Sequence, residues 1–444
     1  MATNSVQLQP AIPLDPDAFQ YNLRRGMLRP DFFNGWQRET LSWKQAAYLG
    51  SNLTMAIQYL SGPDAARLLS ENCTSNIANM KSGRWRHVIM CSEKGNIIRH
   101  GVVLRISEEE FECYSLDPCL EVLSGSGRYN VKPMSKAPFK DFIFQIGGPK
   151  SLEILENAAQ EDLHDIEFMT FRPSSIAGHK VRVLRMGMVG TLGYEVQGSL
   201  ECAHEVYTRI FETGKKYGME KLGAISYTMC NHTENGFPQS GLHFLTADYE
   251  NPEYAKYYKD TGIENSQLKQ IAGSLSDKPE DYYRNPLELG WQGMINFKHN
   301  FPGRDALQKI KETGNYRRIV SLEWNKDDIL DTIGSYFQND TEPYKMMDFP
   351  RDNLFKCSAD KVLDQNGKTI GAAMGRIYTL YYRQMISMAV VDPGYAGIGT
   401  EVKILWGDTG SPQKEIRAKV ARYPYLDLVR NENFDVETIP HYKP

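Results

Sequence analysis

The sequence predicts an α+β protein in which two similar α+β units precede an antiparallel β-barrel or jelly-roll domain. One indication is a strand–helix–strand–strand plan that occurs twice, once before about Val131 and once between Asp141 and Tyr217. Another is a series of strand signals separated by short turns after Tyr316, a pattern typical of antiparallel all-β domains. With 444 residues the chain is too long for one simple core, so roughly two or three domains are expected.

The first unit follows a lead-in of residues 1–32, which we expect to be short and flexible. A helix is predicted to start after Gly62-Pro63, with Asp64 in its first turn, because Ala65, Leu68 and Leu69 recur at helical spacing. Two strands are predicted over residues 86–90 and 97–106, and the acidic run 108–110 is predicted to be a solvated turn.

The second unit repeats this plan. A strand over 141–146 leads through a Gly-Gly-Pro turn into a helix that Ser151 is expected to cap. A strand over 181–186, a hairpin over 187–198 and a helix near 204–217 complete it. Residues 244–282 are polar and rich in tyrosine, and are too long for a simple loop, so we expect an insertion or lid with helical parts.

These patterns divide the chain into the lead-in, a core over 33–315 and a β domain over 316–444. In the last part the strand signals lie at 317–324, 368–375, 384–391, 401–406 and 415–425.

Composition excludes several classes of protein. A net charge of −4 gives no basic footprint for nucleic acid. No apolar run approaches the ~20 residues of a membrane-spanning helix, and the first residues have no secretory-signal pattern. The 7 cysteines are scattered without metal-ligand or disulfide spacing, which favours free thiols in the cytoplasm and no metal. Nothing in the sequence indicates the oligomeric state.

The stretch Gly187–Gly198, GMVGTLGYEVQG, is the most informative in the chain. Glycine turns frame a short strand in which Tyr194 and Val196 share one face and Glu195 takes the other. Taken alone, Glu195 reads as a solvated surface acid. The residues that accompany it along the chain change that interpretation.

Those residues are Phe144–Pro149 (FQIGGP), Tyr227, the turn 234–236, the run 285–291 (NPLELGW) and the run 303–307 (GRDAL). This ordered set resembles the folate-binding aminomethyltransferase (glycine-cleavage T-protein) superfamily. More closely, it resembles the tetrahydrofolate-dependent aryl-ether O-demethylases that act on vanillate and syringate. The resemblance extends from about Phe33 to Tyr425.

The resemblance implies a folate-binding core of duplicated ferredoxin-like α+β units, arranged as two interleaved domains and closed by a small C-terminal barrel. It implies tetrahydrofolate as cofactor and a small aromatic ether as substrate. A methyl or methylene group would pass to the folate and leave a phenol or catechol. Three alternatives remain: a methylene transferase acting on methylenedioxy lignans of the sesamin type, an aminomethyltransferase, and a non-catalytic folate-binding protein.

Four residues match cofactor-binding positions of the family. Glu195 matches the pterin-binding glutamate, whose carboxylate accepts a ring N–H and the exocyclic amino group together. Gln145 matches a glutamine that contacts the pterin, although it is also suited to bonding the following Gly-Gly backbone. Phe237, where the closest demethylases have tryptophan, and Trp291 are candidate aromatic walls, with core packing as the alternative.

Three residues are candidates for catalysis. Tyr227 matches the active-site tyrosine of the demethylases, and a phenol can donate a proton to a leaving phenoxide. Arg99 and His100 replace adjacent aspartates of the T-protein, which argues against a cationic aminomethyl donor. His100 is interpreted as a base, a substrate partner or a strand residue paired with a carboxylate, with the last two favoured. Asp117 precedes a proline, as turn formers do, and has a catalytic role as its second interpretation.

The substrate positions depart from the vanillate-type enzymes. Leu116 stands where those enzymes have an arginine, and Thr54 where they have a histidine. Arginine is the natural partner of a carboxylate. We therefore expect a substrate that carries no carboxylate, or one whose carboxylate binds elsewhere, with Arg99 as a candidate cation.

Overall fold

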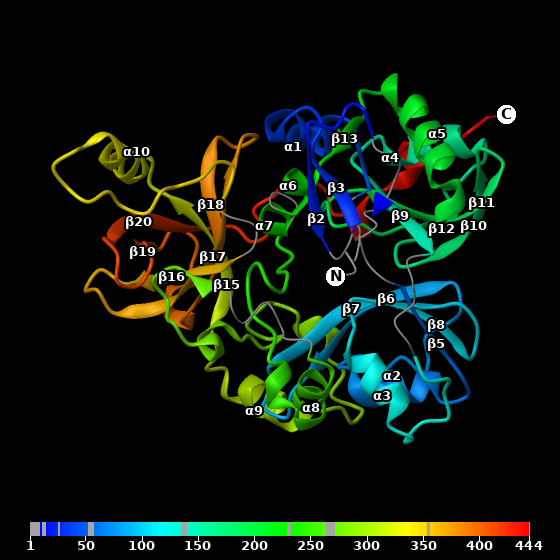
Figure 1. The fold of residues 1–444 in the computed structure, drawn as a ribbon, viewed down its shortest axis with the longest axis horizontal. Helices are drawn as coiled ribbons and strands as arrows, with labels where there is room; N and C mark the ends of the chain where they lie inside the picture. Colours follow the sequence, from blue (N-terminus) through cyan, green and yellow to red (C-terminus); the bar gives the residue numbers. More distant parts are fainter. Residues whose placement is uncertain are drawn as a thin grey trace, which may run out of the picture.

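The computed structural model describes residues 9–10, 15–24, 27–51, 57–134, 140–228, 232–262, 271–352 and 356–443. Figure 1 shows three parts: a first α+β unit that includes β5–β8, a second that includes β9–β12, and a β domain built from β15–β20. The predicted α+β core followed by an antiparallel β domain is confirmed.

The first unit is a four-stranded antiparallel sheet in the order β5-β8-β7-β6. Its elements are β5 (Ile57–Ser61), α2 (Ala65–Asn72), β6 (Arg84–Cys91), β7 (Ile97–Arg105), β8 (Glu110–Tyr114) and α3 (Cys119–Gly125). Helix α2 begins after Asp64 as predicted. Its residues Leu68 and Leu69 are fully buried in a core that both helices share with the sheet.

The second unit arranges its strands in the same way, in the order β9-β12-β11-β10, so the predicted duplication is confirmed. Its elements are β9 (Asp141–Gly147), α4 (Ser151–Ala159), β10 (Phe171–Ile176), β11 (His179–Leu184), β12 (Gly193–Ser199), η1 (Leu200–Cys202) and α5 (Ala203–Lys215). The predicted cap at Ser151 is wrong. Lys150 is the N-cap, and Ser151 is buried as the first residue of α4.

The two units are interleaved. Strand β4 (Tyr48–Gly50) precedes the first unit in sequence but pairs with β9 of the second, and β13 (Glu220–Leu222) pairs with β4. Ahead of β4 lie β1 (Gln9–Pro10), β2 (Gln20–Arg24), β3 (Met27–Phe32) and α1 (Trp36–Gln45). The lead-in therefore contains a β2–β3 hairpin, and buried Asp31 in β3 shows that it is packed on the core.

A long connection leads from the second unit to the barrel. It contains α6 (Ala224–Ser226), α7 (His232–Asn235), η3 (Asp248–Glu250), α8 (Pro252–Thr261), β14 (Ile271–Ala272), η5 (Pro279–Tyr282), η6 (Gln292–Met294) and α9 (Arg304–Thr313). The helical parts predicted over 244–282 are confirmed. Tyr254 of α8 lies in the first unit's core, and β14 pairs with barrel strand β16, so the described part of this segment is packed into the molecule.

The barrel closes through pairing of β16 with β19. Its elements are β15 (Arg318–Trp324), α10 (Lys326–Gly334), η7 (Ser335–Phe337), β16 (Cys357–Leu363), β17 (Thr369–Thr379), β18 (Gln384–Val391), η8 (Pro393–Tyr395), β19 (Glu401–Trp406) and β20 (Lys414–Ala421). The chain then returns to the second unit through η9 (Asn431–Asn433) and η10 (Val436–Thr438), where Val436 joins that unit's core. Figure 1 shows this last segment beside α4 and α5.

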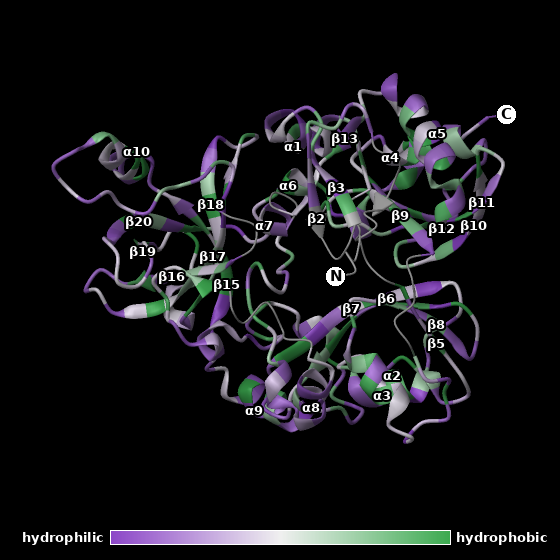
Figure 2. Cartoon of the chain, in the orientation of Figure 1, coloured by the Kyte–Doolittle hydropathy of each residue, from purple (hydrophilic) through white to green (hydrophobic). Residues whose placement is uncertain are grey.

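Hydrophobic and hydrophilic residues alternate along many strands and helices (Figure 2), and buried apolar side chains from these elements form the cores. Within the described ranges, no helix combines the length and the apolar composition that crossing a membrane needs. Cys73, Cys91, Cys113, Cys119, Cys202 and Cys357 are buried free thiols.

Candidate functional site

Strand β12 places Glu195 at the contact between the two sheets. Tyr194 and Val196 pack into the second unit's helical core, so alternation turns Glu195 to the opposite face, as predicted. That face meets the first unit, since one apolar cluster joins Leu104 and Tyr114 to Ile143 and Leu184. Glu195 is 3% exposed, so it is not the solvated acid that the sequence taken alone would suggest.

Glu195 lies at the end of a chain of buried side chains. It pairs in register with Gln145 on β9, whose Nε2 donates to Glu195 Oε1 at 2.8 Å. The Tyr48 hydroxyl donates to Gln145 Oε1 at 3.1 Å, which fixes the orientation of the amide. Gln197 Nε2 lies 3.5 Å from Glu195 Oε2. We call Glu195, Gln145, Gln197 and Tyr48 the Glu195 network.

The Glu195 carboxyl group has an unusually high pKa for a glutamate. Burial raises the pKa of Glu195 to about 7, and the two amide donors oppose that rise. None of the described ion pairs involves Glu195, so its charge has no compensating side-chain cation in that part of the chain. A buried carboxylate in this state is stabilised by a ligand that brings additional N–H donors. A reduced pterin offers two such donors side by side, and the residues present fit it.

Tyr227 follows α6 and is buried beside the Glu195 network. It shares an apolar cluster with Trp43, Tyr48 and Val189. Its ring makes an edge contact with His232, with 6.0 Å between ring centroids. His232 in turn lies 6.3 Å from Phe237, centroid to centroid. Tyr227 is therefore placed between the Glu195 network and a second group of aromatic side chains.

That second group, which we call the aromatic–histidine cluster, consists of His87, His100, Phe237, Phe244 and Trp291. The centroid of Trp291 lies 5.3 Å from that of His87 and 5.2 Å from that of His100. The Phe237 ring lies 5.2 Å from His87 and 5.5 Å from Trp291. The structure brings positions 237 and 291 together within a buried apolar cluster, and their role as aromatic walls stays a prediction. The cluster joins β6 and β7, which hold its two histidines, to the connection that follows α7, which holds its three other members.

The two histidines of this cluster bond to each other. His87 Nε2 lies 3.1 Å from His100 Nδ1, and His100 Nε2 lies 3.5 Å from the Ser240 N–H. Because that N–H can only donate, we assign the proton of His100 to Nδ1, which donates to His87. Burial lowers the pKa of His87 to about 4 and that of His100 well below its usual value, so both rings are neutral at pH 7.

The expectation that His100 pairs with a carboxylate is wrong, because the ring partner of His100 is His87. Sequence reasoning missed His87. The signal that could have found it is the hairpin of β6 and β7. In this hairpin Ile89 pairs with His100, so His87, two residues before Ile89, is a diagonal neighbour of His100 within side-chain reach.

Arg99 is the neighbour of His100 on β7 and points the opposite way. It forms an ion pair with buried Asp248, and its guanidinium donates to the Asp117 carbonyl at 2.8 Å and to the Tyr258 hydroxyl at 2.6 Å. These groups occupy the donors of Arg99 and give no support to its suggested substrate-binding role, which stays a prediction. Asp117 lies on the same side, in a turn before cis Pro118, and no described contact joins it to the aromatic–histidine cluster.

Of the two remaining substrate positions, only Leu116 is among the described residues. Leu116 is fully buried in the first unit's core and packs below β7, where a Cβ on Gly101 would come within 3.1 Å of its Cδ2. This burial gives no support to its assignment as a substrate-binding residue, which stays a prediction. Thr54 lies outside the described residues.

A buried ion pair was also missed by sequence reasoning, which treated residues 234–236 only as a turn. Lys44 Nζ lies 2.5 Å from Glu234 Oε2, and both side chains are almost fully buried. The ammonium also lies 3.9 Å from the Trp43 ring centroid. The pair fixes α7 to α1 next to Tyr227, and the short turn gave no sign of it because the partner is 190 residues away.

Comparisons with known proteins agree with this geometry. A family model described as the GCVT N-terminal domain matches residues 16–243. The sesamin methylene transferase of Sinomonas sp. (strain No.22) is 40% identical over 422 residues, with 92% of each chain covered. The syringate O-demethylase of Sphingobium sp. (strain NBRC 103272 / SYK-6) is 27% identical over 424 residues, with 90% of each covered.

More distant relatives match a smaller part of the chain. An aminomethyltransferase of Thermoanaerobacter sp. (strain X514) is 25% identical over 353 residues, with 78% of each chain covered. Among solved structures, the glycine cleavage system aminomethyltransferase T from Bartonella henselae superposes with a TM-score of 0.66 at 16% identity, covering 93% of this chain and 94% of that one. At this identity the superposition establishes the fold alone.

Proposed function

The chain belongs to the GCVT N-terminal domain family, and from this premise we propose that it is a tetrahydrofolate-dependent one-carbon transferase that removes a methyl or methylene group from an aromatic ether. The observation that carries the proposal is the buried Glu195 carboxylate, whose described partners are amides, together with the aromatic–histidine cluster, which Tyr227 and His232 connect to the Glu195 network. The first feature suits a pterin, and the second suits an arene.

Glu195 and Gln145 would hold the cofactor. The carboxylate accepts hydrogen bonds from the pterin's adjacent N–H groups, and Gln145 keeps that carboxylate in place because Tyr48 fixes its amide. When bound, tetrahydrofolate supplies the nitrogen nucleophile that takes up the one-carbon group. Orientation of the two reactants in one buried site contributes much of the rate enhancement, up to roughly 7–11 kcal/mol for well-aligned pairs.

Tyr227 would assist the departing oxygen. An aryl ether releases its carbon only if the developing phenoxide is stabilised, and a tyrosine hydroxyl is a suitable donor at neutral pH. Tyr227 lies between the Glu195 network and the aromatic–histidine cluster, where the two reactants would meet. The neutral His87–His100 pair would line the arene side, with Phe237 and Trp291 as walls.

A methylenedioxy substrate is favoured over a free methoxybenzoate. The relative named for methylene transfer from sesamin is 40% identical to this chain, against 27% for the syringate O-demethylase. Arg99 is committed to Asp248 and Leu116 replaces the arginine of the vanillate-type enzymes, so both positions lack a free cation for a carboxylate. This supports a neutral arene.

Aminomethyl transfer is the second candidate, because aminomethyltransferases are among the relatives. A cationic aminomethyl donor requires nearby negative charge, whereas the positions of the paired aspartates hold Arg99 and neutral His100. Turnover with an aminomethylated lipoyl carrier protein would favour this candidate.

The test is product analysis. The protein is incubated with tetrahydrofolate and a set of methylenedioxy- and methoxyarenes, and the folates and phenols are identified by mass spectrometry. We expect a catechol together with 5,10-methylenetetrahydrofolate from the methylenedioxy compounds. A phenol with 5-methyltetrahydrofolate would instead assign methyl transfer. Turnover of none of the arenes would contradict the proposal.

The proposal also includes a reducing compartment, the cytoplasm, as the location of the protein. It is supported by the six buried cysteine thiols of the described chain, which form no disulfide.

A further inference from the structure

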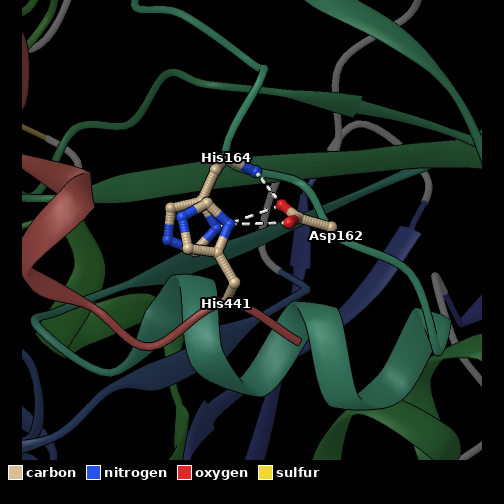
Figure 3. Close-up of side chains that lie close together, drawn as sticks. All are labelled: Asp162, His164 and His441. Carbon is tan, nitrogen blue, oxygen red and sulfur yellow. Dashed lines mark hydrogen bonds and ion pairs between the residues drawn. The ribbon is translucent and has the colours of Figure 1, made fainter. Parts of the chain in front are cut away.

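Asp162, His164 and His441 converge outside the site described above, where the last part of the chain returns to the second unit (Figure 3). Asp162 and His164 lie in the loop between α4 and β10, and His441 follows η10. One potential ligand atom from each side chain can be chosen so that all lie within 4.8 Å of one another. Two imidazoles and a carboxylate are a donor set suited to zinc and neighbouring divalent metals.

Both imidazoles turn the same ring nitrogen toward Asp162. His441 Nδ1 lies 2.7 Å from Asp162 Oδ2, and His164 Nδ1 lies 3.2 Å from Asp162 Oδ1. The rings are stacked, with centroids 3.8 Å apart and an angle of 19° between their planes. Figure 3 shows the two rings face to face beside the carboxylate.

The outer nitrogens of the two rings have acceptors of their own. His164 Nε2 lies 3.1 Å from the carbonyl oxygen of Ile439, and His441 Nε2 lies 3.3 Å from Glu437 Oε2. Each Nε2 can donate to its acceptor, whereas each Nδ1 faces only carboxylate oxygens, so its lone pair must hold either a proton or a cation between the ring and those oxygens. Metal-binding histidines show this arrangement, in which the outer N–H donates to a carbonyl or carboxylate.

The lone pairs face further negative charge. Glu156 Oε1 lies 2.7 Å from His164 Nδ1, so Glu156, Asp162 and Glu437 surround the two rings with three carboxylates. No lysine or arginine among the described residues forms an ion pair with these three acids. Positive charge at the two Nδ1 atoms must therefore come from added protons or from a bound cation.

We propose that Asp162, His164 and His441 bind a divalent transition-metal ion, with zinc as the first candidate, through the two Nδ1 atoms and the Asp162 carboxylate. Glu437 and the Ile439 carbonyl orient the two imidazoles through their outer nitrogens, Glu156 lies on the ligating side of His164, and water completes the coordination shell. The stacked rings must splay for both lone pairs to reach one ion. His441 can rotate because its side chain is 47% exposed, whereas His164 is held in the core at 4%.

The ion would hold the final segment onto the second unit. That segment already contacts the strands beside Glu195, because Arg185 donates to the Asn431 and Phe434 carbonyls at 2.9 and 2.8 Å, and Asn431 Nδ2 donates to the Gly193 carbonyl at 3.0 Å. A metal at His441 therefore ties together the loop after α4 and the segment that supports β12.

Titration calorimetry of the full chain with Zn²⁺, after removal of bound metal with a chelator, tests the site. We expect about one high-affinity ion per chain and a higher melting temperature with zinc present. His441→Ala removes an exposed ligand with little risk to folding and should weaken Zn²⁺ affinity by at least about tenfold, the scale that loss of even an outer-shell partner produces. Co²⁺ should give visible absorption bands in the unmodified protein that the variant lacks.

His179→Ala is the matched control. This imidazole is also partly exposed and lies 3.2 Å from a carboxylate, Glu205, and none of the ring contacts among the described residues joins it to a second imidazole. Zinc affinity should be unchanged in this variant. Equal zinc affinity in His441→Ala and the unmodified protein would overturn the proposal, as would an equal loss in both variants. Absence of binding heat and of thermal stabilisation at about 100 μM zinc would also overturn it.

Discussion

At the residue scale, the chemistry of the candidate site depends on a buried acid held by neutral partners. Glu195 receives hydrogen bonds from Gln145 and Gln197, and burial raises its pKa to about 7. Since the ionised form is the better acceptor, a ligand that donates N–H groups should favour ionisation of this residue. Folate affinity should therefore depend on whether Glu195 is ionised.

The first prediction concerns Glu195→Gln. Loss of the charge should weaken tetrahydrofolate binding by about 1.5–3 kcal/mol at pH 8, the value of a hydrogen bond to a charged group. In the unmodified protein the ionised fraction falls as the pH drops below the pKa of about 7, so affinity should fall up to about tenfold per pH unit there and level off above it.

Calorimetry between about pH 6 and 8.5 measures both effects. The glutamine variant is the internal control, because it has no carboxyl group at this position and its folate affinity should change much less over that range. Equal affinity of the two proteins at pH 8 would remove Glu195 from the cofactor site.

Tyr227→Phe removes one hydroxyl and keeps the ring in its cluster with Trp43 and Tyr48. If the hydroxyl assists the leaving oxygen, kcat on an unactivated aryl ether should fall by about 10²–10⁴, the usual contribution of general acid catalysis. Folate affinity should change little. The loss should shrink for nitro-substituted ethers, whose phenoxides leave readily. Near-full activity of the variant on methoxyarenes would assign the role to another group.

Part of the site was predictable at this scale. Alternation in a three-residue strand predicted the face of Glu195, and the structure confirms it. The pairing of Glu195 with Gln145 depends on the register between β12 and β9, which local sequence does not encode. The ion pair of Arg99 with Asp248 was not predicted, because Asp248 lies in a connection whose path the sequence left open.

At the scale of elements, the buried pair of Lys44 and Glu234 fixes α1 to α7 beside Tyr227. Removing one partner leaves an uncompensated buried charge. We expect Lys44→Met to lower the free energy of unfolding by about 3–5 kcal/mol, measured by denaturant titration. The matched control is Lys150→Met, since the exposed Lys150–Glu153 pair contributes at most about 1 kcal/mol. Equal effects of the two substitutions would mean that the buried pair does not fix these helices.

Most elements were predictable because their periodicity is strong. Helices α2 and α5 and strands β7, β9 and β18 lie within a few residues of their predicted ranges. Strand β16, CSADKVL, was missed because acid and base side chains interrupt its apolar pattern. It is stabilised by long-range pairing with β17 and β19. The β2–β3 hairpin was missed because its sequence has no clear strand periodicity, and its packing on the core is what stabilises it.

At the scale of the whole molecule, two units with the same strand order meet face to face and place the Glu195 network at their contact. The repeated plan was visible in sequence, as was the barrel. The aromatic–histidine cluster was only partly visible, because it joins β6 and β7 to positions 237 and 291, and only the folded chain brings these together.

The whole arrangement determines which substrate charge the site accepts. Arg99 is held by Asp248, and Leu116 lies in the core, so neutral methylenedioxy- or methoxyarenes should be turned over faster than vanillate or syringate. Comparison of kcat/KM for an acid and its methyl ester isolates the charge from the ring pattern. A faster reaction of the free acid would show that a cation outside these two positions binds the carboxylate.

The most direct test of one-carbon transfer at this site follows the carbon itself. A methylenedioxyarene labelled with ¹³C at the bridging carbon is mixed with excess protein and tetrahydrofolate, and the label is traced by NMR in a single turnover. We expect the label in the folate, in equal amount to the catechol formed, and a much slower transfer with Glu195→Gln. Label that remains in the arene, or that appears only as free formaldehyde, would contradict transfer to folate.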